Sequence, residues 1–122
     1  FKKFKLIPVK RGGGSEEVMK VKEMGKDRLS RGNWIIIFPE GTRMEYNKSK
    51  KYGLSGSILA KETCSMVLPI SHNSGKYWKR RGLIKKQGVI SFVIGETFNS
   101  NNMSLDEINK VAREWIDDNV ID

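Results

Sequence analysis

Hydrophobic positions along the chain change period several times, from runs typical of strands to spacings typical of helices. Residues 33–38 are β-rich and apolar on both faces, which predicts a buried central strand. Residues 88–95 are nearly continuously apolar and predict the last strand. Residues 6–9 and 66–70 predict two shorter strands, and Pro69 in the second favours an edge or a strand end.

Between these runs, polar and small residues indicate where helices begin and end. Ser15 predicts the start of a helix that Gly32 ends, and small side chains in residues 53–63 favour a second, closely packed helix. Ser104 and Glu107 form a capping box for the last helix. The apolar stripe of that helix consists of Leu105, Ile108, Val111, Ala112, Trp115, Ile116 and Val120.

Strands that alternate with helices predict an α/β domain with a mostly parallel sheet flanked by helices. The 122 residues fit one domain or part of one. The chain begins at Phe1 without an initiator Met, so we expect residues 1–122 to form a single partial domain. Residues 71–87 predict a long loop, and loops of that length are usually functional or disordered.

Charge is distributed unevenly along the chain. The net charge is +9, but residues 104–122 hold six acidic and two basic side chains, whereas residues 1–103 hold 21 basic and eight acidic ones. The basic part would attract nucleic acid, an anionic lipid surface or phosphorylated small molecules.

Cysteine content and hydropathy exclude two classes of protein. A single cysteine, Cys64, excludes an internal disulfide framework and a cysteine-based metal cluster, and we expect it to be a buried structural thiol. No run approaches the roughly 20 apolar residues that span a bilayer, and no signal-peptide core is present.

The strongest candidate for a binding site is the run Phe-Pro-Glu-Gly-Thr-Arg at residues 38–43, directly after an apolar strand. Arg43 presents a planar fork of donors that suits phosphate or carboxylate. Arg11 ends the preceding strand, so the two guanidinium groups would form a phosphate clamp at the carboxyl edge of the sheet. Alternatively, Glu40 and Arg43 form only a structural ion pair.

These segments together resemble a known family. Residues 38–43 resemble the most specific motif of the glycerolphosphate and lysophosphatidic acid acyltransferases. Residues 7–11 resemble the block whose arginine contacts the acceptor phosphate, and residues 67–70 resemble a later proline block. Residues 88–95 and the helix that Ser104 caps resemble the usual ending of the family.

The resemblance implies acyl transfer from acyl-CoA or acyl carrier protein, as co-substrate, to the free hydroxyl of lysophosphatidic acid. The product would be phosphatidic acid, an intermediate of phospholipid biosynthesis, and neither a cofactor nor a metal is implied. Arg11 and Arg43 would bind the acceptor phosphate, and Glu40 would bind the glycerol part or orient Arg43. Gly41 and Thr42 would shape the turn.

The resemblance also implies a catalytic pair in the pattern His-x-x-x-x-Asp, in which His is the general base and Asp orients it. The one histidine, His72, is followed five positions later by Tyr77, so the chain lacks this pattern. We therefore expect the pair upstream, an inactive chain on its own, and a role for His72 in loop hydrogen bonding.

A basic and aromatic cluster lies between the third and fourth predicted strands. Its members are Tyr77, Trp78, Lys79, Arg80 and Arg81. Such a cluster suits an anionic membrane surface or the donor's phosphates, although it would equally suit a solvated loop. We expect the protein at the cytoplasmic face of a membrane, either peripheral or anchored through upstream segments.

Two alternatives to an acyltransferase stay open. A pI of 9.8 and the basic aromatic cluster would suit a nucleic-acid-binding module, although no nucleic-acid motif is visible. A non-catalytic fragment that binds anionic phospholipid is the second alternative.

Overall fold

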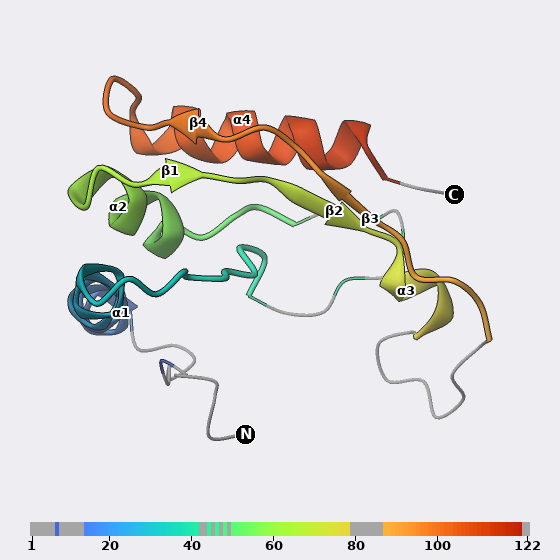
Figure 1. Cartoon of the computed structure of the whole chain (residues 1–122), viewed down its shortest axis with the longest axis horizontal. Helices are drawn as coiled ribbons and strands as arrows, with labels where there is room; N and C mark the ends of the chain where they lie inside the picture. Colours follow the sequence, from blue (N-terminus) through green and yellow to red (C-terminus); the bar gives the residue numbers. More distant parts are fainter. Residues whose placement is uncertain are drawn as a thin grey trace.

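The computed structural model describes residues 7, 14–41, 44, 46, 48, 50–78 and 87–120. The elements in these residues follow one another as α1 (Gly14–Ser30), α2 (Ser55–Glu62), β1 (Met66–Val67), β2 (Ile70–His72), α3 (Ser74–Tyr77), β3 (Phe92–Ile94), β4 (Phe98–Asn99) and α4 (Leu105–Asp118), as Figure 1 shows.

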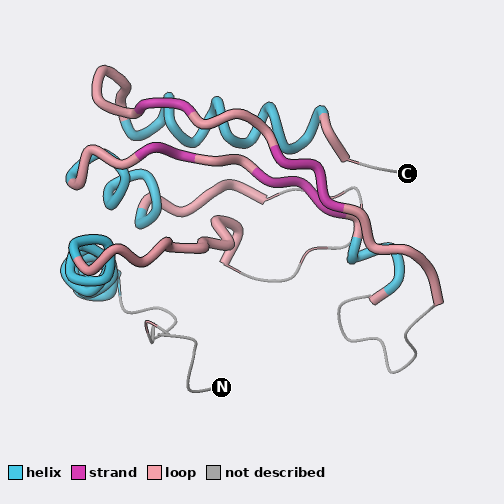
Figure 2. The backbone as a smooth tube through the Cα atoms, in the orientation of Figure 1, coloured by secondary structure: helices cyan, strands magenta, loops and turns pink. Residues whose placement is uncertain are grey.

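The strands form two antiparallel pairs (Figure 2). Both pairs join the segment that holds β1 and β2 to the segment that holds β3 and β4. β1 pairs with β4, and β2 pairs with β3 so that Ile70 lies opposite Ile94. Between the pairs, Gly95 N–H donates to Pro69 O at 3.0 Å. The prediction of a mostly parallel sheet is wrong for the described strands, because the described part of the connection from β2 to β3 holds only the four-residue α3 instead of a crossover helix.

Residues 33–38 follow a drawn-out path (Figure 2) but belong to no helix or strand, which corrects the prediction of a buried central strand. The exposed fractions of Trp34, Ile36 and Phe38 are 86%, 80% and 75%. Ile37, on the other side of the segment, contacts α2, where its Cδ1 lies 3.0 Å from the position of a Cβ on Gly56. Ile37 is still 38% exposed, so within the described residues this segment has one partly covered face and one uncovered apolar face.

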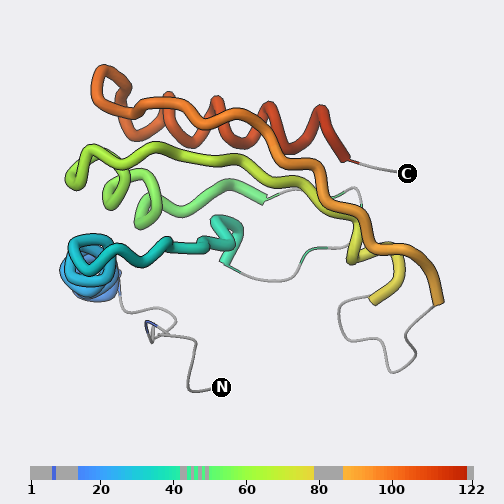
Figure 3. The backbone as a smooth tube through the Cα atoms, viewed as in Figure 1, coloured from blue at the N-terminus to red at the C-terminus, as the bar shows by residue number. Residues whose placement is uncertain are grey.

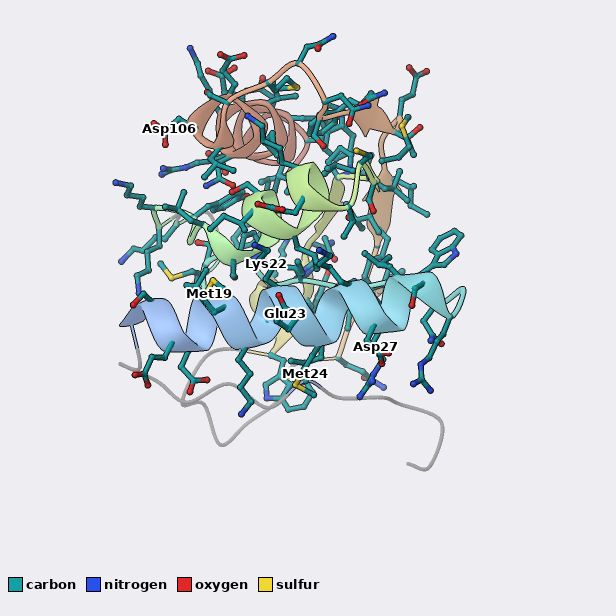
Figure 4. All side chains as sticks on the ribbon, turned by 90° about the vertical axis from the view of Figure 1, so that its left-hand side faces the viewer. Met19, Lys22, Glu23, Met24, Asp27 and Asp106 are labelled. Atoms are coloured by element: carbon teal, nitrogen blue, oxygen red, sulfur yellow. The ribbon has the colours of Figure 1, made fainter. Side chains whose placement is uncertain are left out.

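α2 lies between α1 and α4 and forms the centre of the core (Figure 1). Leu59 is only 2% exposed, and its side chain contacts α1 where Gly25 leaves room. Lys22 lies on the side of α1 that faces α2, where its Nζ is 3.5 Å from Glu62 Oε1 (Figure 4). The close contact depends on a residue without a side chain in the middle of α1.

The predicted ends of two helices are confirmed. α1 ends before Gly32, which has a φ of +81° and donates its N–H to Leu29 O at 3.0 Å. Ser104 caps α4, since its Oγ accepts a hydrogen bond from Glu107 N at 3.2 Å. Local capping chemistry therefore places both boundaries.

Three other predictions need correction or lie outside the described residues. Cys64 is exposed with a φ of +53°, because it lies in the tight turn between α2 and β1, so the prediction of a buried thiol is wrong. The predicted loop over residues 71–87 includes the end of β2 and all of α3. Of the predicted strand 6–9, only Ile7 is described.

The helices described in the structure are all too short or too polar to cross a lipid bilayer.

We expect Gly95→Ala to lower the free energy of unfolding by about 1–3 kcal/mol. A Cβ at this position would lie 2.8 Å from Trp115 Cζ2 and 3.1 Å from Pro69 Cγ, so the Trp115 ring on α4 would have to move. Urea denaturation measures the effect, with Glu96→Ala at the exposed neighbouring position as control. Equal stability of Gly95→Ala and the parent chain would show that Trp115 does not pack tightly there.

Candidate functional site

Residues 38–41 form the tight turn that the sequence predicts. Gly41 N–H donates to Phe38 O at 2.9 Å, which closes a four-residue β-turn with Pro39 at its second position. Gly41 has a φ of +70°, a conformation that a residue with a Cβ rarely adopts. The acidic side chain of Glu40 is thereby presented on a closed turn at the end of the extended segment.

A second segment, residues 50–53, holds this turn from the side (Figure 3). Lys50 N–H donates to Glu40 Oε2 at 2.8 Å, and Gly53 N–H donates to Pro39 O at 2.9 Å. A carboxylate that accepts a backbone N–H has fewer accessible rotamers, because the bond would be lost on rotation. Glu40 is therefore oriented by the backbone of the neighbouring segment.

Tyr52 lies within this second segment and is only 6% exposed. Burial raises the pKa of Tyr52 from 10.0 to about 12, with the charges of Glu40 and Asp117 adding to the effect and Arg113 opposing it. The Arg113 guanidinium carbon lies 6.0 Å from the centre of the Tyr52 ring, and Arg113 Nε lies 3.7 Å from Asp117 Oδ2. The Tyr52 hydroxyl therefore loses its proton at a higher pH than an ordinary tyrosine does.

α4 makes a second contact with the same segment. Asn109 Nδ2 donates to Gly53 O at 3.2 Å, although the two residues are 56 positions apart. Neither Tyr52 nor Asn109 could be identified from the sequence. Nothing in the local pattern distinguishes Tyr52 from the nearby Tyr46, and Asn109 lies on a helix whose apolar stripe was its evident feature.

The predicted acceptor-site residues are described only in part. Glu40 and Gly41 lie on the turn, whereas Arg11, Thr42 and Arg43 lie outside the described residues. The convergence of the two arginines thus stays a prediction.

The basic aromatic cluster is likewise described in part. Tyr77 ends α3, and its ring lies against the backbone of Gly88. Trp78 follows as an exposed side chain. Lys79, Arg80 and Arg81 lie outside the described residues.

His72 ends β2, and its ring takes part in local hydrogen bonds, as predicted. Its Nδ1 lies 2.8 Å from Ser74 Oγ and accepts from Ser74 N at 3.3 Å. The exposed ring also lies 5.8 Å from the Phe92 ring. In the described part of the chain, no group of three or more His, Cys, Asp or Glu side chains could hold a metal ion.

Comparison with known proteins connects this turn to a family. A family model described as Acyltransferase matches residues 1–73, which is more than half of the chain and includes the turn. The chain belongs to the acyltransferase family.

The chain is similar to the 1-acyl-sn-glycerol-3-phosphate acyltransferase of Pseudomonas aeruginosa, with 33% identity over 115 residues. This alignment covers 92% of the present chain and 45% of the Pseudomonas aeruginosa relative. The fold matches the crystal structure of the 1-acyl-sn-glycerophosphate (LPA) acyltransferase, PlsC, from Thermotoga maritima, with a TM-score of 0.73 and 23% identity. That match covers 80% of this chain and 41% of the other. The chain spans less than half the length of each.

We expect Tyr52→Phe to make the acyltransferase chain less sensitive to alkaline pH. The folded-state pKa of about 12 lies above 10.0, so Tyr52 loses its proton more easily when unfolded. The free energy of unfolding should therefore fall as pH rises from about 10 to about 12, by on the order of 2 kcal/mol. Urea denaturation between pH 9 and pH 12 should show this fall in the parent and a smaller one in Tyr52→Phe.

Tyr77→Phe, which removes a phenol at a different place, is the control. An identical alkaline loss in the parent and in Tyr52→Phe would contradict the assignment to Tyr52.

Proposed function

We propose that this chain forms the acceptor-binding part of a 1-acylglycerol-3-phosphate acyltransferase. The reaction transfers an acyl group from acyl-CoA or acyl carrier protein to the free hydroxyl of lysophosphatidic acid and forms phosphatidic acid. The observation that carries the proposal is the closed turn at residues 38–41, in which Glu40 is held by Lys50 N–H. The similarity to a 1-acylglycerol-3-phosphate acyltransferase supports it.

In this reaction, the acceptor oxygen attacks the thioester carbonyl, the C–S bond breaks, a C–O ester bond forms, and the thiol leaves with a proton. Arg11 and Arg43 bind the acceptor phosphate through charge-assisted hydrogen bonds. Glu40 binds the glycerol part or orients Arg43, while Gly41 and Thr42 shape the turn. A His-x-x-x-x-Asp pair, which this sequence does not contain, supplies the general base from elsewhere in the protein.

The proposed place of action is the cytoplasmic face of an anionic membrane, where the lipid acceptor resides. The +9 net charge and the exposed Trp78 support this placement, because cations and aromatic rings favour a lipid interface. Two rival functions predict different results. A nucleic-acid module would bind DNA or RNA with a steep salt dependence, and a non-catalytic fragment would bind lipid without turnover.

Arg43→Ala is expected to raise the KM for lysophosphatidic acid at least about ten-fold, since a charge-assisted phosphate contact is lost. The assay uses a chimera in which residues 1–122 replace the matching portion of the Pseudomonas aeruginosa relative. His72→Ala, which alters a local hydrogen bond beside Ser74, is the control and should stay within a few-fold of the parent. An unchanged KM in Arg43→Ala would remove this arginine from the acceptor site.

Changing Lys79, Arg80 and Arg81 together to Ser should reduce binding to anionic liposomes about ten-fold or more. Each cation near such a surface contributes on the order of 1 kcal/mol. Co-sedimentation with anionic and zwitterionic vesicles measures the effect. The matched control removes three exposed cations elsewhere, by changing Lys20, Lys26 and Lys61 to Gln. If both triple variants lose the same affinity, net charge and not this cluster binds the lipid.

A further inference from the structure

We propose that Asn109 of α4 is a positioning residue for the acceptor turn, a role that rests on the proposed function. Asn109 does not touch the turn itself. Its Nδ2 donates to Gly53 O, and Gly53 N–H in turn donates to Pro39 O. The backbone of Gly53 thus connects α4 to the turn that presents Glu40.

The same helix face makes a second contact with this segment. Asn109 and Arg113 are four positions apart, so both side chains project from one face of α4. Asn109 bonds Gly53, and the Arg113 guanidinium lies over the ring of the preceding residue, Tyr52. α4 therefore contacts both Tyr52 and Gly53. In the same segment, the backbone N–H of Lys50 donates to the Glu40 carboxylate.

α4 is a suitable anchor because it is fixed at three places along its length. Ser104 caps its first turn, Ile108 beside Asn109 is buried, and the Trp115 ring lies against Gly95. The extended segment before the turn is held less firmly, since Trp34, Ile36 and Phe38 are exposed. The helix therefore supplies the rigid side of the site.

Loss of the Asn109 amide should loosen Gly53 and let the Pro39–Glu40 turn shift. A displaced Glu40 weakens acceptor binding, whereas the thioester donor keeps its contacts. We expect Asn109→Ala in the chimera to raise the KM for lysophosphatidic acid about three- to ten-fold while leaving the KM for acyl-CoA unchanged. Asn109→Gln keeps an amide donor and should restore part of the acceptor affinity.

The matched control is Asn119→Ala. Asn119, the C-cap of α4, donates from Nδ2 to Trp115 O at 2.8 Å, so this variant removes an amide from the end of α4 without touching Gly53. It should change the melting temperature and leave both KM values unchanged. Equal acceptor KM values for Asn109→Ala, Asn119→Ala and the parent would overturn the proposal.

A second measurement does not depend on activity. Hydrogen exchange of the Lys50 and Gly53 amides, measured by NMR, should be faster in Asn109→Ala than in Asn119→Ala, because both amides bond the turn. Equal exchange rates would overturn the positioning role. A parent chimera without lysophosphatidic acid acylation would instead overturn the proposed function, and the exchange rates would still decide the role of Asn109.

Discussion

The position of the turn at residues 38–41 depends on the hydrogen bond from Gly53 N–H to Pro39 O, at 2.9 Å. It is the contact through which residues 38–41 are joined to a segment that the core holds. The extended residues before the turn expose most of their apolar surface on one side, so they cannot position the turn alone. A second bond, from Lys50 N–H to Glu40, depends on the same alignment of the two segments.

Charge around the turn is balanced by groups from distant parts of the chain. Glu40 and Asp117 both oppose ionisation of the buried Tyr52, whereas Arg113 favours it. Among the described residues, Glu40 and Asp117 are the carboxylates that act on Tyr52, in a chain whose net charge is +9.

Several features could be predicted because they depend on neighbours in sequence. The cap at Ser104, the end of α1 at Gly32 and the turn at Gly41 each follow from one residue's backbone preference or hydrogen-bonding side chain. The strand partners could not be predicted in this way. The apolar run of residues 88–95 predicts a strand, and Phe92–Ile94 do form β3, but Phe92 and Ile94 are 64% and 65% exposed. The direction of the partner strand depends on where the chain returns after β2.

The sequence by itself determined α1, α2 and α4, the turn motif with Glu40, and membership of the acyltransferase family. Only the tertiary structure decided that the described strands pair antiparallel, that Cys64 is exposed, and that Tyr52 is buried beside the turn. It also brought Asn109 to Gly53. The physical reason is range: caps and turns are set by residues within four positions, whereas strand pairing and burial arise from contacts between segments that are distant in sequence.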